Sequence, residues 1–319
     1  MPPKLNPRDR EILFALPFDS WKDTLATLHM WTQIVGKVRL ELCPLVNHWW
    51  NVTFYVTARG LTTSTMPFAA ADVEVSFDFI DHKLLIQTCD GGTRVLALRP
   101  QSVADFYREF MAALAELGVE VNILTKPQEV PDPIPFEQDT VHASYDAEAV
   151  HRFWRILVWV DEVFKEFRAG FIGKVSPVHF FWGSFDLAAT RFSGRRAPPH
   201  PGGVPHLPDA VAREAYSHEV SSAGFWPGGP GAEEAVFYSY AYPEPPGFRT
   251  APAGPPQARY DAGLGEFLLP YDAVRTAADP DAVLLEFLNA TYAAAADAAG
   301  WDRAALECAP GRPGKPRPV

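Results

Sequence analysis

SPVHFFWGSFDLAATRFSGR, residues 176–195, is the stretch around which the rest of the chain is organised. Its aromatic and small residues suit a pleated, half-buried surface, so it is expected to form one long strand between Pro177 and Gly194. Alternate residues of a strand share a face, and one face would therefore hold His179, Phe181, Gly183, Phe185, Leu187, Ala189 and Arg191. A bulge at Gly183 would exchange the faces beyond it. Polar residues within this aromatic strand indicate a pocket.

Composition limits the classes of partner. The chain has 319 residues, 47% of them hydrophobic, which is enough for a core in one large or two ordinary domains. Its net charge of -11 disfavours nucleic acid and anionic membranes. The start MPPKLNPRDREILF lacks the apolar run of a signal peptide, and no later stretch is long enough to span a membrane. We therefore expect a cytoplasmic protein with a small-molecule partner and three reduced cysteines, Cys43, Cys89 and Cys308.

Periodicity predicts the order of elements. Leu25, Leu28 and Trp31 have helical spacing, which predicts a helix over 21–35 that ends at Gly36. Strands are expected next, at 37–46, 48–59, 73–80, 83–88 and 93–98, as an antiparallel meander. Further helices are expected at 101–118, at 147–167 and from Pro280 onward. The proline- and glycine-rich segments 197–208 and 226–256 are expected to be long loops.

Short strings recur in the two parts of the chain. Val35-Gly36-Lys37-Val38 after the first helix is matched by Ile172-Gly173-Lys174-Val175 after a later one. We therefore predict an α+β fold of two similar halves, each an antiparallel sheet flanked by helices, related by a pseudo-twofold duplication. The predicted units are an N-terminal half at 16–124, an ordered connector at 125–145, a C-terminal half with the site at 146–307, and a disordered tail at 308–319.

A histidine and carboxylate set is the first candidate site. His179, His218 and Glu219, with His142, His200 and His206 as additions, could hold a divalent zinc, iron or manganese ion with open coordination positions. No compact spacing such as H-E-x-x-H is present. Adjacent His218 and Glu219 would face opposite ways in a strand. The alternative is that these are hydrogen-bonded histidines of a pocket or core.

A second candidate lies in the connector. Asp139 precedes His142 by three residues and could orient its imidazole as a general base, although Asp139 could equally cap a helix. Arg191 and Arg195 could stabilise negative charge on a substrate. Alternatively, they could form buried ion pairs with Glu41, Asp186 or Glu219.

Aromatic residues suggest the walls of a ligand pocket. Trp182 and Trp226, together with His48 and Tyr145, are the residues expected to line it, and core packing is the alternative for the aromatic ones. Serine-hydrolase and nucleotide-binding motifs are absent from the sequence.

Three long runs carry a resemblance to a known family. They are TLHMWTQIVGKVRLELCPLVNHWWNVTFYVTARGLTTS, SPVHFFWGSFDLAATRFSGR and YSHEVSSAGFWPG. In these runs the chain resembles the bacterial domain-of-unknown-function family number 5996, over about Leu16 to Trp301. The resemblance implies a soluble bacterial protein and brings no activity, cofactor or catalytic residue with it.

Two functional hypotheses follow. The first is a small-molecule enzyme with a histidine and carboxylate centre in a polar-aromatic cleft, metal-dependent and hydrolytic or oxidative. The second is a non-catalytic ligand-binding or interaction module whose histidines are structural. Convergence of His142, His179, His218 and Glu219 on one point would favour the first hypothesis, and their separation into different niches would favour the second. The sequence does not select a substrate, a metal or an oligomeric state.

Overall fold

The computed structural model describes residues 14–317 except 70, 230–232, 312–313 and 316. Its described part has two antiparallel sheets and seven α-helices, which confirms the α+β class. The first sheet is a meander in sequence order, formed by β1 (Tyr55–Val56), β2 (Gly60–Thr62), β3 (Val73–Asp78), β4 (Lys83–Thr88) and β5 (Thr93–Ala97).

The second sheet has the order β10-β11-β9-β8-β7-β6. Its strands are β6 (His179–Phe181), β7 (Asp186–Arg196), β8 (His218–Trp226), β9 (Val236–Tyr242), β10 (Arg259–Asp261) and β11 (Glu266–Pro270). A two-way backbone bridge between Phe54 and Phe180, with both N···O distances 2.9 Å, connects the chain just before β1 to the edge strand β6.

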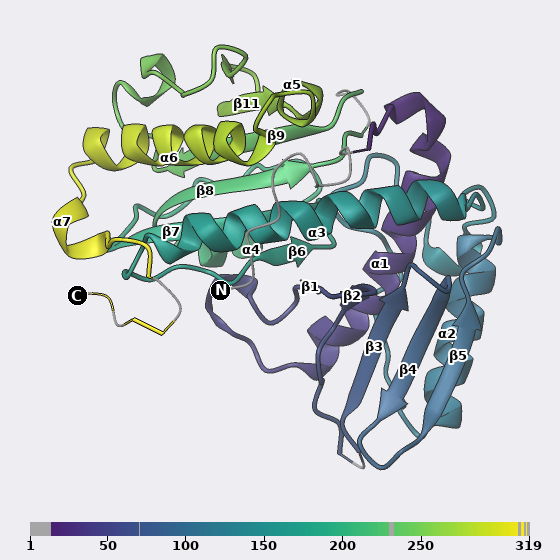
Figure 1. The fold of residues 1–319 in the computed structure, drawn as a ribbon. Helices are drawn as coiled ribbons and strands as arrows, with labels where there is room; N and C mark the ends of the chain where they lie inside the picture. Colours follow the sequence, from purple (N-terminus) through teal and green to yellow (C-terminus); the bar gives the residue numbers. More distant parts are fainter. Residues whose placement is uncertain (1–13, 70, 230–232, 312–313, 316, 318–319) are drawn as a thin grey trace.

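Helices join and cover the two sheets (Figure 1). They are α1 (Lys22–Leu42), α2 (Val103–Glu116), α3 (Ala147–Ala169), α4 (Asp209–Ala215), α5 (Tyr271–Arg275), α6 (Pro280–Ala298) and α7 (Arg303–Leu306). Side-chain caps start α2, α3 and α6, where Ser102, Asp146 and Asp279 each accept a hydrogen bond from a first-turn backbone N–H. Helices α3 and α6 lie along one face of the second sheet.

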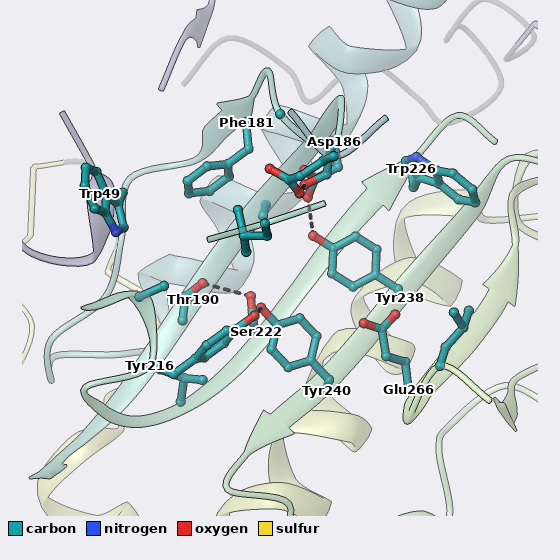
Figure 2. A pocket seen from close by; sticks show the side chains of 18 of the residues that line it. Trp49, Phe181, Asp186, Thr190, Tyr216, Ser222, Trp226, Tyr238, Tyr240 and Glu266 are labelled. Carbon is teal, nitrogen blue, oxygen red and sulfur yellow. Dashed lines mark hydrogen bonds between the residues drawn. The ribbon is translucent and has the colours of Figure 1, made fainter. Parts of the chain in front are cut away.

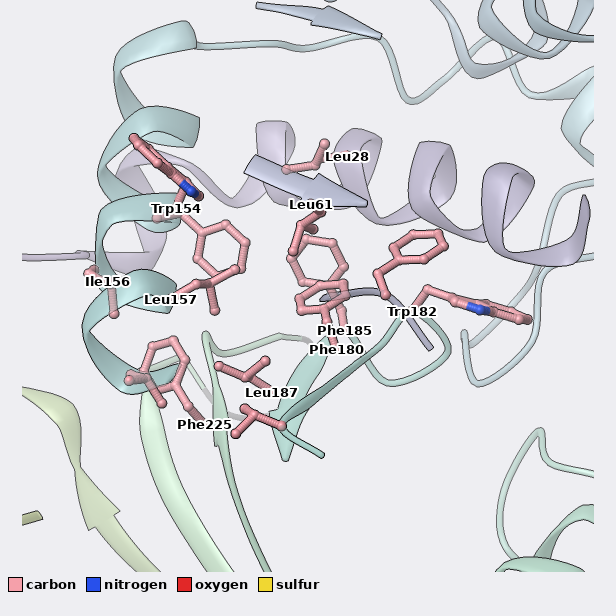
Figure 3. Close-up of a cluster of buried hydrophobic side chains, with 14 of the residues drawn as sticks. Leu28, Leu61, Trp154, Ile156, Leu157, Phe180, Trp182, Phe185, Leu187 and Phe225 are labelled. Carbon is pink, nitrogen blue, oxygen red and sulfur yellow. The ribbon is translucent and has the colours of Figure 1, made fainter. Parts of the chain in front are cut away.

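Strand alternation gives the second sheet two different faces. One cross-strand row, Leu187, Phe225, Phe237 and Leu269, is fully buried towards α3 and α6. The neighbouring row, Ala188, Gly224, Tyr238 and Leu268, points to the other side, as Thr190, Ser222 and Tyr240 do two residues along. Figure 3 shows the helix-facing side, where Leu187 and Phe225 pack with Leu157. The opposite side is left for a cavity.

The first helix is longer than its glycine suggested. The expected end at Gly36 and the expected strand at 37–46 are wrong, since α1 continues to Leu42. Gly36 lies within the helix because the indole of Trp182 packs directly on it, and a Cβ there would lie 2.4 Å from that ring. The strand expected at 48–59 is also wrong for most of its length: a 3-10 turn (Asn47–Trp49) comes first and only β1 follows.

The segment 176–195 is a hairpin and not one long strand. Phe185, with φ 61°, ends a turn between β6 and β7. The hairpin pairs His179 with Ala188 and Phe181 with Asp186, so these four residues share the sheet face opposite Leu187, Ala189 and Arg191. The turn therefore separates His179 from the face that the single-strand interpretation gave it. The segment 226–256 is likewise not one loop, because it contains β9.

Some of the elements predicted from the sequence are confirmed, and the predicted duplication is not tested by the structure. The helices at 101–118 and 147–167 and the strands at 73–80, 83–88 and 93–98 are confirmed within a few residues of their ends. The pseudo-twofold duplication stays a prediction.

Of the tail predicted to be disordered, residues 312–313, 316 and 318–319 lie outside the described residues, while the described Cys308 and Arg317 hydrogen-bond backbone carbonyls at the end of α3. Among the described helices, none has the length and apolar character needed to span a membrane.

Candidate functional site

A cavity of about 1120 Å³ lies on the side of the second sheet that faces away from α3 and α6. Strands β7, β8, β9 and β11 form its floor. Its walls come from the residues around the 3-10 turn at 47–49, the β6–β7 turn, the connector at 128–129 and helix α4. The volume suits a ligand of drug-like size.

Asp186 is the central polar group of this cavity. It is 6% exposed and accepts a hydrogen bond from the Tyr238 hydroxyl, which reaches it across β8 (Figure 2). Tyr238 can lie there because the residue opposite it on β8 is Gly224, where a Cβ would lie 2.3 Å from the hydroxyl oxygen. Burial raises the pKa of Asp186 to about 7, and the charge of Glu129 adds to this effect.

Two further carboxyl groups face the same cavity. Burial raises the pKa of Glu266 to about 7, with contributions from Asp186 and Asp261. Within the described part of the chain the Glu266 side chain has no hydrogen-bond partner. Burial also raises the pKa of Glu129, whose Oε2 accepts a hydrogen bond of 2.9 Å from the Ser184 hydroxyl. Burial is the main cause of the raised pKa at both Glu266 and Glu129.

The remaining hydroxyl groups of the floor are largely paired with one another. The hydroxyls of Tyr216 and Tyr240 are 3.0 Å apart, and those of Thr190 and Ser222 are 2.8 Å apart (Figure 2). Burial raises the pKa of Tyr216 to about 12 and that of Tyr240 well above its usual value. Both tyrosines therefore stay protonated over the physiological pH range.

Aromatic rings enclose these polar groups. Figure 2 shows Trp49 and Phe181 on one side of Asp186 and Trp226 on the other. Trp49 is fixed by a hydrogen bond of 3.1 Å from its Nε1 to the Val211 carbonyl on α4. The cavity thus combines an apolar wall with a small number of acidic groups, as ligand sites commonly do.

Unusual backbone conformations occur at the cavity wall. His48, Trp49 and Glu129 have φ values of 61°, 59° and 57°, and all three line the cavity. Residues other than glycine adopt this left-handed backbone conformation at a cost of about 1 kcal/mol or more. Such residues concentrate at functional sites, and three of them at one cavity support a functional role for it.

His48 adds a basic group that is held neutral. Its Nε2 lies 2.6 Å from the Lys174 ammonium, and its Nδ1 lies 2.9 Å from the Ala215 carbonyl. The lysine can only donate, so His48 carries its proton on Nδ1 and donates it to Ala215. Burial lowers the pKa of His48, and the charge of Lys174 acts in the same direction.

Three of the four residues expected to line a pocket do line this cavity: His48, Trp182 and Trp226. Tyr145 does not. Its ring stacks on Trp31 at 5.4 Å between centroids, and its hydroxyl lies 2.9 Å from Nδ1 of His82. Tyr145 is therefore a buried core residue that packs against α1.

The Asp139 and His142 pair forms but lies outside the cavity lining. Oδ2 of Asp139 is 2.7 Å from Nδ1 of His142, and Oδ1 accepts from the backbone N–H groups of Val141 and His142. The carbonyls of both residues accept from N–H groups at the start of α2. The pair therefore fixes the connector to that helix, which is closer to the capping alternative than to a general base.

The residues expected to bind a metal do not converge. No group of three His, Cys, Asp or Glu in the part of the chain described by the structure has the arrangement of a metal site. His179 is 1% exposed and packs among Trp50, Tyr55 and Phe181, and burial lowers its pKa to about 3. His218 contacts the Ser217 hydroxyl and the ring of His48. A metal therefore does not fit the predicted ligand set.

The two candidate arginines are structural in their contacts. Arg195 forms a salt bridge of 2.7 Å to Glu219 and donates to the carbonyls of Ala299 and Gly300. Arg191 is 3% exposed on the helix-facing side, with its guanidinium 3.5 Å from the ring centre of Phe167 and 4.3 Å from that of Tyr292. Neither arginine lines the cavity.

Four lining residues were not predicted from the sequence, and Asp186 was expected only as an ion-pair partner of an arginine; the four are Glu129, Tyr238, Tyr240 and Glu266. For the tyrosines a signal was present, since the alternating run Val236–Tyr242, VFYSYAY, is typical of a strand with one aromatic face. The surrounding prolines and glycines led to its interpretation as a loop. Nothing in the sequence links Glu129 to Asp186, because the connector and β7 meet only in the folded chain.

Comparisons with known proteins give one match. The model of a family of unknown function, DUF5996, matches residues 13–308. No curated protein and no solved structure matches the chain.

Proposed function

The chain belongs to the family of unknown function DUF5996, and from its cavity we propose that it is an enzyme that binds a small organic molecule and exchanges protons with it through Asp186. The observation that carries the proposal is the environment of this carboxyl group. It is buried at the floor of a cavity of about 1120 Å³, is held by Tyr238, and has a pKa raised to about 7. A group with a pKa near the working pH is the most effective general acid or base.

Each neighbouring group has a role in this proposal. Asp186 takes a proton from the substrate when ionised, or donates one when protonated. The Tyr238 hydroxyl fixes the orientation of the Asp186 carboxyl group. Glu266 faces the same cavity with a pKa also raised to about 7, so the two carboxyl groups can divide the acid and base roles. The aromatic walls exclude water and bind the apolar part of the substrate.

The test compares the wild-type protein with Asp186→Asn, which keeps the shape of the side chain and removes the exchangeable proton. Each protein is incubated with a total small-molecule extract of cells, and bound and free compounds are identified by mass spectrometry. Glu120→Gln, an exposed carboxyl group outside the cavity lining, is the matched control.

We expect a compound that the wild type and the control consume, and that Asp186→Asn retains without consuming. Consumption by Asp186→Asn at the wild-type rate would contradict the assigned role. A compound bound but unchanged by all three proteins would indicate a non-catalytic binding module.

That binding module is the second candidate function, and one observation favours it. His142, His179 and His218 each occupy a separate niche with its own neighbours, as expected if the histidines are structural. The same separation disfavours the form of the enzyme hypothesis that used a histidine-bound metal.

A further inference from the structure

The charge of the cavity selects a class of ligand. Six carboxyl groups line it: Glu129, Asp186, Glu233, Glu234, Asp261 and Glu266. Arg259 is the arginine of the lining, and it is paired with Glu234 at 3.2 Å. The lining histidine, His48, is kept neutral by burial and by Lys174. An anionic ligand would therefore enter against an uncompensated negative charge.

The hydrogen-bond donors and acceptors of the cavity also favour a ligand that carries donor groups. The Tyr238 hydroxyl already donates to Asp186, and the Ser184 hydroxyl already donates to Glu129. In each of the pairs Tyr216–Tyr240 and Thr190–Ser222, one hydroxyl donates to the other, so each pair keeps a single O–H group for a ligand. An ionised carboxylate has about four acceptor positions, so Asp186, Glu129 and Glu266 together offer many more acceptors than the floor has donors. The ligand has to supply the missing N–H or O–H groups.

The walls determine the rest of the ligand. The rings of Trp49, Phe181, Trp226 and Tyr238 present apolar surface around the carboxyl groups. Aromatic faces attract cations as well as apolar groups, by about 0.5–2 kcal/mol for each favourable contact. An ammonium group on an apolar body would neutralise the negative charge of the lining, donate hydrogen bonds to the carboxylates and pack against the aromatic walls.

We propose that the natural ligand of this cavity is an organic amine, bound as its ammonium ion to Asp186 and Glu266 with its apolar part against the aromatic walls. This inference rests on the proposed binding of a small molecule in the cavity and adds the class of that molecule. A neutral polyol would supply donors but no positive charge, so it would leave the negative charge of the lining without a counter-charge.

The experiment uses three fluorescent probes with one dansyl group and a matched alkyl chain. Dansylcadaverine ends in an ammonium group, N-pentyl dansylamide ends in a methyl group, and N-dansyl-6-aminohexanoic acid ends in a carboxylate. Each is titrated at pH 7.5 into the wild type, Asp186→Asn, Glu266→Gln and the control Glu120→Gln. Dansyl emission rises when the group leaves water, so it reports binding directly.

We expect the ammonium probe to bind the wild type about tenfold or more tightly than the methyl probe, since a hydrogen bond to a charged group contributes that much. Asp186→Asn and Glu266→Gln should each remove most of this preference and leave the affinity for the methyl probe within about twofold. Binding of the methyl probe also shows that each variant is folded. The control should match the wild type.

Two other outcomes separate the two proposals. Equal affinity for the ammonium and methyl probes, or a preference that survives both substitutions, would overturn the amine inference while leaving the binding cavity in place. No saturable binding of any of the three probes would contradict the binding cavity itself, and the amine inference with it.

Discussion

The Tyr238 hydroxyl donates a hydrogen bond to Oδ2 of Asp186 across the intervening strand β8. The contact exists because β8 has glycine at the position between them, Gly224, over which the tyrosine side chain lies. Asp186 is the residue that follows the β6–β7 turn, and Tyr238 belongs to a strand 52 residues later. The geometry of the carboxyl group thus depends on a glycine that contributes no chemistry of its own.

Substitution of that glycine tests the relationship. In Gly224→Ala the new methyl group displaces the Tyr238 ring, so the hydrogen bond that lowers the pKa of Asp186 is lost and this pKa should rise above about 7. Tyr238→Phe removes the same hydrogen bond without any backbone change and should have the same effect. The pKa is measured from the pH dependence of unfolding. An unchanged pKa in both variants would show that the hydrogen bond does not control this carboxyl group.

The free energy of unfolding should depend on pH through Asp186. Its pKa is about 7 in the folded chain against an ordinary 3.8, so the folded state holds a proton that the unfolded state releases. This contribution is fully present below about pH 4 and is lost as the pH rises to about 7, with a total of about 4 kcal/mol.

Asp186→Asn should therefore raise the melting temperature at pH 8 and change it little at pH 4. Calorimetry at both pH values checks this, with Glu120→Gln as the control. A stabilisation of equal size at both pH values would contradict the raised pKa.

Arg191 supports the fold from the helix-facing side of the sheet. Arg191→Ala would leave a void among Phe167, Phe171 and Tyr292, and we expect it to cost about 2–4 kcal/mol in urea unfolding. Arg191→Met fills more of the same space and should cost less. Both variants should bind the ammonium probe as the wild type does, because Arg191 does not line the cavity. If the variants lose probe binding but keep normal stability, Arg191 takes part in ligand binding and the prediction is wrong.

His179 should behave as a core residue. His179→Ala removes a side chain that is 1% exposed, and we expect a loss of about 2–4 kcal/mol in the free energy of unfolding. The metal content of the untagged protein, measured by elemental mass spectrometry, should be the same in the wild type, His179→Ala and His218→Ala. Near-stoichiometric metal in the wild type that falls in both variants would support the hypothesis that His179 and His218 bind a metal.

Much of the fold was predictable because its signals are local. The meander of β3, β4 and β5 and the helices α2 and α3 are encoded by alternation, helical spacing and turn residues, and the structure has them within a few residues of their expected ends. The errors occur where tertiary contacts override local signals. Gly36 does not end α1 because Trp182 packs on it, and the aromatic run at 176–195 bends into a hairpin at residues 182–185.

The site was predictable only in its aromatic wall. His48, Trp182 and Trp226 were expected at a pocket, and they line the cavity. The acidic floor was not expected, because Glu129, Asp186 and Glu266 come from three distant segments whose meeting depends on sheet order. The histidines suggested a metal site because of their chemistry, yet His142, His179 and His218 lie in separate surroundings.

The most direct test of Asp186 as the acid–base group of the cavity is a pH titration of protein labelled with ¹³C at the aspartate side-chain carboxyl, followed by NMR. The structure predicts one aspartate resonance with a pKa near 7 that is absent from Asp186→Asn. If every aspartate of the folded wild-type protein titrates at its ordinary pKa, near 3.8, the proposed role of Asp186 is contradicted.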